Sequence, residues 1–403
     1  MILFEDAVNI VLSNAITLDA ERIDISESVG RILAEDLFSD MDMPPFDKSA
    51  VDGFACMTYD LKLLNETPQN HIQQTIILQV DETIAAGSIP GKMIQPGHCS
   101  KIMTGAMVPP GAGCVVMVED TEPAGENLVR INQATESKNI CYKGEDIKTG
   151  DLVLHQGIQI APAHVAVLAA IGATNPLVSM LPRVGIISTG DELVEPSRTP
   201  GPAQIRNSNA WQLEAQLKTV PAITAYYGIA SDESSQLRNM IGLAMEENDV
   251  VLLTGGVSMG EFDFVPAIME EAGVEILFKS VAIQPGKPTV FGRRNNTIIF
   301  GLPGNPVSSF VVFEMLVRPF LRHMMGIAVD PPMFILPMGV DFSRRKSARK
   351  SMIPVMIRDG AVYPVDYHGS AHINAYAMAS GILVMQIGTT VIHKGEPVHV
   401  RPI

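Results

Sequence analysis

The stretch LLTGGVSMGEFDF, residues 252–264, passes from an apolar run into a glycine-rich loop that carries acids. Gly255 and Gly260 have the G-x-x-x-x-G spacing of a P-loop, which continues with Lys and then Ser or Thr. Here Glu261 follows instead, and Asp263 comes two residues later. Mg²⁺ is held by one or two carboxylates together with phosphate oxygens and water. The loop therefore predicts phosphate binding through a bridging Mg²⁺.

Within this loop we expect different residues to contact the phosphate and the metal. Gly255, Gly256 and Ser258 belong on the phosphate side, where small residues let backbone N–H groups approach an anion. Asp263 is the candidate metal ligand. Glu261 belongs farther from the metal, because only alternate side chains of an extended turn point inward.

Two further loops are expected at the same edge of a sheet. The apolar run at 183–188 leads into Thr-Gly-Asp-Glu, which ends at Glu192, and the run at 297–302 leads into Pro-Gly-Asn-Pro at 303–306. Ligands of open α/β sheets bind outside the carboxyl ends of the strands. Each loop alone has an ordinary explanation as a strand-to-helix turn, a helix cap or a β-turn. Their joint occurrence favours one site, with Glu192 as a second Mg²⁺ ligand.

Three more charged residues are candidates for this site. Asp232 follows the apolar run at 223–230 and is also a plausible helix N-cap. Lys287 follows a Pro-Gly turn, and Lys279 precedes that turn. Near the acidic loops these lysines would stabilise an oxyanion. The commoner role of such a lysine is that of a solvated surface residue.

Composition restricts the class of protein. The 403 residues carry a formal net charge of −15, which disfavours nucleic acid and anionic membranes as partners. The four cysteines form no C-x-x-C pair and have no zinc-finger spacing, so free thiols in a reducing cytosol are expected. The first residues lack the basic region of a signal peptide, and no apolar stretch is long enough to span a bilayer. The sequence predicts a soluble cytoplasmic protein.

The pattern of strands and helices predicts four domains. Residues 181–326 alternate short apolar runs with helical segments, which indicates a parallel sheet covered by helices on both faces. Residues 46–145 form a β-rich domain of short strands without a long helix, and residues 327–403 form a small β-barrel domain. Residues 1–45 together with 146–180 make a discontinuous N-terminal domain.

These stretches together resemble the molybdopterin molybdenumtransferase family, which includes MoeA and the E domain of gephyrin. The matching motifs, in the family's order, are PPFDKSAVDGFA, KIMTGAMVPPGAGCVVMVEDTE, GEDIKTGD, STGDEL, TGGVSMGEFDF, PGKP and LPGNPVSS, with a weaker match at HGSAHI. The resemblance implies an elongated linker domain, a MogA-like α/β domain, and Mg²⁺-dependent insertion of molybdate into adenylylated molybdopterin with release of AMP. It also implies a homodimer whose clefts combine the α/β domain of one chain with the β-rich domain of the other. Implied protein partners are the molybdopterin adenylyltransferase and molybdoenzyme maturation proteins.

The resemblance also carries residue roles, one motif at a time. The implied catalytic residues are Asp52, Thr104, Asp146, Glu192, Asp232 and Asp263. The candidate substrate-binding residues are then Gly255, Gly256, Ser258, Lys279, Lys287, Pro303, Pro306 and Ser370.

The chain departs from the family pattern at anion-binding positions. Gln284 precedes PGKP where relatives have lysine, Ser280 replaces a second lysine, and Pro354 stands near an expected arginine. A nearby basic cluster consists of Arg344, Arg345, Lys346, Arg349 and Lys350. The carboxylate and glycine framework is intact.

Two other functions stay open on the sequence alone. One is a molybdopterin adenylyltransferase, because such enzymes share the α/β domain type. The other is a non-catalytic pterin-binding scaffold, for which the changes at Ser280 and Gln284 would be the signature. Only a molybdenum transferase would release AMP from adenylylated pterin in a molybdate-linked way.

Overall fold

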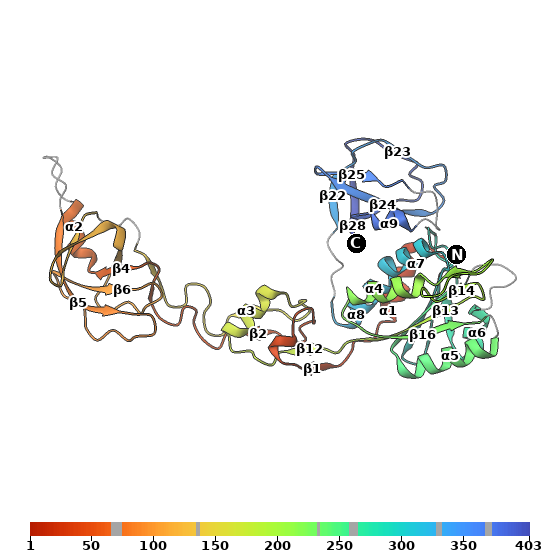
Figure 1. Cartoon of the computed structure of the whole chain (residues 1–403), viewed down its shortest axis with the longest axis horizontal. Helices are drawn as coiled ribbons and strands as arrows, with labels where there is room; N and C mark the ends of the chain where they lie inside the picture. The colour runs from red at the N-terminus through yellow and green to blue at the C-terminus, as the bar shows by residue number, and fades with distance from the viewer. Residues whose placement is uncertain (66–74, 134–137, 232–233, 258–264, 328–332, 367–372) are drawn as a thin grey trace. The chain divides into compact units, whose positions relative to one another are not determined.

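The computed structural model describes residues 1–65, 75–133, 138–231, 234–257, 265–327, 333–366 and 373–403 (Figure 1). By its internal contacts the chain divides into two compact units. The larger unit contains Met1–Glu35, Gln156–Val165 and Asn175–Ile403, and the smaller contains Asp36–His155 and Ala166–Thr174. The smaller unit is thus inserted into the larger one, while the boundaries of the four domains stay a prediction.

The larger unit is built on a mixed six-stranded sheet. Its strand order is β16 (Ile223–Ala230), β13 (Arg183–Thr189), β17 (Val250–Thr254), β21 (Thr297–Leu302), β20 (Val290–Arg294) and β18 (Glu275–Phe278). The first four strands are parallel, and β20 is antiparallel to both of its neighbours, β21 and β18. β18 therefore runs in the same direction as the first four strands. The predicted parallel sheet thus holds for every strand except β20, which was not predicted. Strands β20 and β21 are joined by a tight turn with Asn295 at φ +54°, and so short a connection joins only antiparallel strands.

Helices cover both faces of this sheet, as predicted. One face is covered by α4 (Asn209–Lys218), α7 (Pro306–Val312) and α8 (Arg318–Met324), and the other by α5 (Ser234–Glu247) and α6 (Val265–Glu271). Phe300 of the sheet packs edge-on against Phe320 of α8, with 5.5 Å between ring centroids. Burial of such large aromatic side chains is a main source of stability for the layer.

The first helix, α1 (Phe4–Ser13), joins the same core from the start of the chain. Its Ala7 and Val11 are buried in the cluster that contains Phe300. Ile2 forms an isolated bridge with Val281, and the Glu5 carboxylate pairs with the Lys350 ammonium. All of these partners lie far along the chain.

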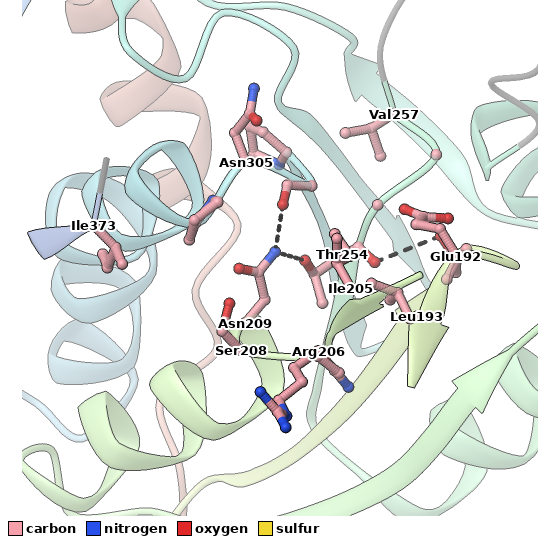
Figure 2. A pocket seen from close by; sticks show the side chains of 18 of the residues that line it. Glu192, Leu193, Ile205, Arg206, Ser208, Asn209, Thr254, Val257, Asn305 and Ile373 are labelled. Carbon is pink, nitrogen blue, oxygen red and sulfur yellow. Dashed lines mark hydrogen bonds between the residues drawn. The ribbon is translucent and has the colours of Figure 1, made fainter. Parts of the chain in front are cut away.

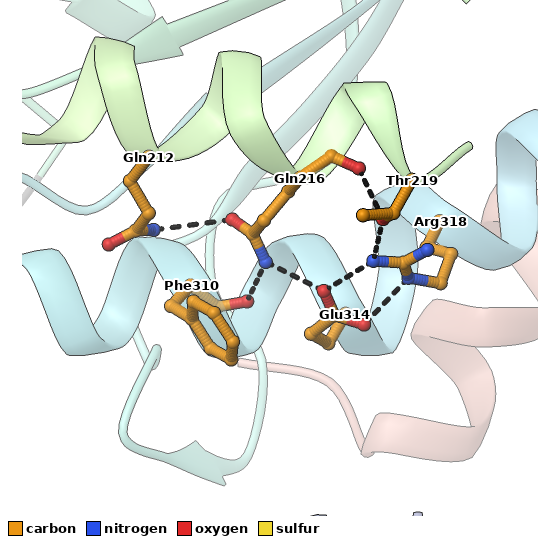
Figure 3. Close-up of polar contacts among 6 residues, drawn as sticks. All are labelled: Gln212, Gln216, Thr219, Phe310, Glu314 and Arg318. Carbon is orange, nitrogen blue, oxygen red and sulfur yellow. Dashed lines mark hydrogen bonds and ion pairs between the residues drawn. The ribbon is translucent and has the colours of Figure 1, made fainter. Parts of the chain in front are cut away.

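A buried polar network joins α4 to the helices beside it (Figure 3). Glu314, 2% exposed, lies in η3 (Phe313–Val317), a π-helical turn between α7 and α8. Its carboxylate accepts hydrogen bonds from Gln216 Nε2 at 2.7 Å and from Arg318 Nε at 2.6 Å and Nη2 at 2.8 Å. Pro319 lacks an N–H and would clash with the carbonyl four residues earlier in a regular helix. The wider π-turn avoids that clash.

The C-terminal part of the larger unit is a second six-stranded sheet. Its path is β19 (Ile283–Gln284), β24 (Lys350–Arg358), β26 (Gly381–Met385), β28 (Pro397–Pro402) and β22 (Phe334–Pro337), with β25 (Ala361–Pro364) paired to β24. Val355, Leu383 and Val400 lie at the centre of its core. The pairing of β19 with β24 ties this sheet to the Gln284-Pro285-Gly286 turn.

The smaller unit is β-rich, as predicted. Its six strands run in the order β7 (Cys114–Met117), β4 (Gly53–Cys56), β6 (His98–Ile102), β5 (Ile76–Ile84), β9 (Leu128–Ile131) and β8 (Thr121–Gly125), with the short α2 (Thr58–Asn65) beside them. Cys56, Cys99 and Cys114 are buried in its core, and all four cysteines are free thiols, as expected. Across the described residues of the chain, no helix is long and apolar enough to cross a membrane.

Candidate active site

The loops that follow β13, β17 and β21 meet at one cavity of about 690 Å³ (Figure 2). These strands are parallel neighbours, so their carboxyl ends lie at the same edge of the sheet. The prediction that the three loops emerge together is therefore confirmed. Five predicted site residues line the cavity, namely Glu192, Gly255, Gly256, Pro303 and Pro306.

Glycines allow these loops to approach one another. Gly255 has φ +102°, and a Cβ there would collide with the Thr189 carbonyl oxygen. Gly256 has φ +61°, and a Cβ there would come within 2.7 Å of Val265. The Gly255 N–H donates to the Leu302 carbonyl at 3.1 Å. This hydrogen bond holds the loop against β21. The Gly255 N–H is therefore used within the protein and is not free to bind a ligand.

Glu192 supplies a carboxylate at the exposed rim of this cavity. The carboxylate folds back over Gly190, where φ is +138° and a Cβ would overlap it. Within the parts of the chain that are described, no group of three or more His, Cys, Asp or Glu residues is arranged to hold a metal ion. Mg²⁺ needs only one or two protein carboxylates when a phosphate supplies the other oxygens. Glu192 therefore fits such a metal.

The sequence analysis missed a polar segment that forms another wall of the cavity. Arg206, Ser208 and Asn209 line it, from the end of β15 (Ile205–Arg206) and the start of α4. The signal was present in the run Arg-Asn-Ser-Asn directly before an apolar helix, which is the composition of a helix N-terminus. Such residues usually cap the helix, so their contacts across the sheet could not be predicted.

Hydrogen bonds tie this segment to the strand ends. Asn209 Nδ2 donates to Thr254 Oγ1 and to the Gly304 carbonyl, both at 2.8 Å. Asn207 Nδ2 donates to Ser188 Oγ at 3.0 Å and to the Tyr226 hydroxyl at 2.8 Å. The start of α4 is therefore fixed to all three loop-bearing strands.

Tyr226 continues this network away from the cavity. Its hydroxyl donates to the Glu195 carboxylate at 2.8 Å. Burial, and then the Glu195 carboxylate, raise the pKa of Tyr226 well above its usual range. The phenol therefore stays protonated at neutral pH and acts as a fixed hydrogen-bond donor.

The predicted lysines do not line this cavity. Lys279, with a side chain 56% exposed, forms an ion pair with Glu270 at 2.8 Å. Lys287 is half-buried in the turn, and the neighbouring Pro288 lines the cavity instead. The positively charged side chain on the described lining is Arg206, whose Nε donates to the carbonyls of Pro196 and Arg198.

The basic cluster of the C-terminal sheet lies beside Gln284. Gln284, Ser351 and three cations, Arg344, Arg345 and Lys346, line a second cavity of about 300 Å³. Arg349 Nη2 reaches the Gln284 side-chain oxygen at 3.4 Å, and Lys350 is engaged by Glu5. Pro354 is buried in β24 opposite Ile382.

Three predicted catalytic residues belong to the smaller unit. Asp52 Oδ1 accepts hydrogen bonds from the Thr104 backbone N–H at 2.6 Å and from its hydroxyl at 2.9 Å. These two bonds hold the pKa of Asp52 below its usual range. Asp146 is exposed, and its backbone N–H donates to the Met43 carbonyl at 3.1 Å.

Five candidates from the sequence lie outside the described residues. They are Asp232, Ser258, Glu261, Asp263 and Ser370. Their proposed roles stay predictions.

Comparison with family models matches two regions of the chain. Residues 2–172 match the model described as the MoeA N-terminal region (domain I and II). Residues 185–323 match the model described as a probable molybdopterin binding domain.

Curated relatives cover nearly all of the chain. The chain is 32% identical to the molybdopterin molybdenumtransferase of Staphylococcus epidermidis, over 98% of this chain and 94% of the relative. It is 32% identical to the Staphylococcus aureus protein of the same name, with the same coverage.

Solved structures show the same fold. A molybdopterin biosynthesis moeA protein from Pyrococcus horikoshii aligns with a TM-score of 0.85 at 28% identity, over all of both chains. A molybdenum cofactor biosynthesis protein from Pyrococcus furiosus aligns over all of both chains with a TM-score of 0.63 at 20% identity, which bears on the fold alone.

Proposed function

The chain belongs to the molybdopterin molybdenumtransferase family, and from this premise we propose that its cavity binds adenylylated molybdopterin and transfers molybdenum to it. Molybdate would be the metal donor and AMP the leaving product. The observation that carries the proposal is the meeting of three strand-end loops at one cavity of about 690 Å³. Its glycine turns allow close approach of a phosphate, and the cavity is large enough for a fused heterocycle.

Charged residues of the cavity suit the cleavage of a phosphoanhydride. Arg206 would attract the anionic substrate, since it is the positively charged side chain on the described lining. Glu192 and Asp263 would hold Mg²⁺. When bound, Mg²⁺ would neutralise phosphate charge and so favour departure of AMP. The hydrogen bonds of Asn209 and Asn207 would keep the loop ends fixed during the reaction.

We further infer a homodimer in which the smaller unit of one copy completes the site of the other. Asp52, whose exposed carboxylate is held by Thr104, is a candidate catalytic acid in a unit that has no part in the described cavity lining. A second copy would bring this acid to the cavity. Sedimentation at micromolar concentration tests the dimer, and an active monomer would exclude the shared site.

The test of the reaction is AMP release from adenylylated molybdopterin, measured with and without molybdate. We expect molybdate to accelerate release in the wild-type protein. Glu192→Gln should slow release on the order of 10²-fold, because a preorganised electrostatic contact is lost. The matched control is Glu214→Gln in α4, where the acid pairs with the exposed Lys218 and does not line the cavity, so the rate should not change. Release that does not depend on molybdate would contradict the proposal, and binding without any release of AMP would favour the non-catalytic scaffold.

A further inference from the structure

A second cavity of the larger unit, which we call the basic pocket, lies apart from the candidate active site. Its volume is about 300 Å³, and it has no lining residue in common with the larger cavity. Arg344, Arg345 and Lys346 line it together with the neutral polar residues Gln284 and Ser351. The described lining of the basic pocket therefore carries three positive charges and no negative one.

Such a group of cations without acids is unexpected in this chain, which has 44 acidic side chains against 29 lysines and arginines. An exposed cation elsewhere in the larger unit, Arg293, pairs with Glu275 at 2.9 Å. Arg345 and Lys346 are also exposed, but neither forms an ion pair with an acid in the described part of the chain. Like charges on adjacent residues repel each other, and a bound anion would offset that repulsion.

The other polar side chains of the basic pocket are held in place by hydrogen bonds. Arg344 donates to the carbonyls of Thr389 at 2.7 Å and Arg349 at 2.9 Å, and also to the Ser351 hydroxyl. Arg349 Nη2 donates to the side-chain oxygen of the exposed Gln284 at 3.4 Å, which leaves the Gln284 amide nitrogen as the end available to a ligand. A fixed guanidinium and an amide donor therefore accompany the two exposed cations.

The ordinary role of exposed lysines and arginines is to keep a protein surface soluble. That role accounts for Arg345 and for Lys346 when each is taken alone. It does not account for a cavity that these two residues line together with the half-buried Arg344, because a partly buried charge is normally matched by an opposite one. An anion in the basic pocket would supply that opposite charge.

We propose that the basic pocket binds a tetrahedral oxyanion with two negative charges, of the class that includes sulfate, hydrogen phosphate and molybdate. Arginine and lysine are the side chains that bind such ions. The described lining has no apolar side chain on which a heterocycle could stack, so the ligand is a small ion. The pocket is separate from the candidate active site, and the inference does not rest on the proposed function.

The experiment measures binding of sodium molybdate, sulfate and phosphate in separate calorimetric titrations of the full chain, at an ionic strength held constant with sodium chloride. Arg345→Ala/Lys346→Ala should weaken binding about 10- to 100-fold, because two charge-assisted contacts are lost. The matched control, Lys218→Ala/Arg293→Ala, removes the same charges from exposed ion pairs outside both cavities and should keep the wild-type affinity. Any binding that the larger cavity contributes should persist in both variants.

A second variant, Gln284→Glu, keeps every cation of the basic pocket. It places a carboxylate of the same shape beside Arg349 and the bound anion, so it should weaken binding roughly 10-fold or more through like-charge repulsion. This variant decides the question if the double variant does not fold.

Several outcomes would overturn the proposal. They are equal affinity of the wild-type protein and the Arg345→Ala/Lys346→Ala variant, an equal loss in the control, and no binding of any of the three anions in excess of chloride. A loss confined to molybdate would identify molybdate as the ligand, and a loss for all three anions would identify a general oxyanion site. AMP release is a separate measurement, so its failure would count against the proposed function and leave the basic pocket standing.

Discussion

Gly255 illustrates how a single residue type is required at the candidate site. Its φ of +102° and the closeness of the Thr189 carbonyl leave no room for a side chain. We expect Gly255→Ala to destabilise the protein by about 1 to 3 kcal/mol, as is typical of strained backbone positions. Urea unfolding measures the change. Gly242→Ala in α5 is the matched control, since nothing lies within 4 Å of its Cβ position. That substitution should stabilise the helix by roughly 0.5 to 1 kcal/mol, and equal effects at the two sites would contradict the steric explanation.

Thr104 controls the protonation of Asp52 in the smaller unit. Its backbone N–H and its hydroxyl both lower the pKa of Asp52. Thr104→Val removes the hydroxyl and keeps the N–H, so the pKa should rise part of the way toward its ordinary value. Because the folded-state pKa is lowered, the interaction stabilises the protein above the ordinary carboxyl pKa and is lost as pH falls through the folded-state value. Titration by carboxyl NMR checks this. An unchanged pKa would show that the N–H alone fixes Asp52.

At the level of single residues, the sequence predicted Glu192 and the loop glycines as neighbours, but it did not predict the surroundings of Lys279. Glu192, Gly255 and Gly256 line the cavity because each follows directly from a strand end, and strand ends are recognisable from apolar runs. Asn209 depends on neighbours that are remote in sequence, and Lys279 depends on Glu270, which lies nine residues earlier on another element. Nothing in the sequence around Lys279 indicates that Glu270 engages it.

The helix pair α4 and α7–α8 is held by the network of Glu314, Gln216 and Arg318 (Figure 3). Glu314→Leu leaves the half-buried guanidinium of Arg318 without its carboxylate and should cost about 3 to 5 kcal/mol of unfolding free energy. The double variant Glu314→Leu/Arg318→Met should recover most of that loss, because no charge is then buried unpaired. Denaturant unfolding measures the change in unfolding free energy of both variants.

The control for this element is another i,i+4 pair. Glu214 and Lys218 of α4 form such a pair, with side chains 29% and 70% exposed. Glu214→Leu should change stability by less than about 1 kcal/mol, as is usual for exposed pairs. A Glu314→Leu variant as mild as this control would mean that solvent reaches the network.

One antiparallel strand of the sheet, β20, was not predicted from the sequence. Apolar runs at 183–188, 249–254 and 297–302 correctly predicted β13, β17 and β21. The run at 275–278 also correctly predicted a strand, β18, which runs in the same direction as these three because β20 between β18 and β21 is antiparallel to both. The tight turn at Asn295 makes β20 antiparallel to β21, and β20 was not recognised as a strand from the sequence.

At the scale of the whole molecule, the candidate residues are divided between two units. Asp52 lies in the smaller unit and Glu192 in the larger one. If a site combines both units from different copies, then Asp52→Asn and Glu192→Gln proteins, each inactive alone, should recover activity after subunit exchange. Random exchange makes half of the dimers mixed, each with one intact site of two, so about a quarter of the wild-type rate is expected.

The controls for this exchange are the two variants incubated separately under the same conditions. They should stay inactive. Absence of recovery, with mixed dimers demonstrated by mass spectrometry, would mean that each site is built within one copy.

The packing of α1 has a consequence for how the chain is made. The partners of this helix lie in the last third of the sequence, and Glu5 and Lys350 are separated by 345 residues. At a translation rate of about 5 to 20 residues per second, the ribosome needs roughly 20 to 70 s to deliver them. During that interval the inserted smaller unit, with its own core, can fold completely. Meanwhile Ala7 and Val11 stay in contact with solvent or a chaperone, so α1 is a segment of the nascent chain that needs protection.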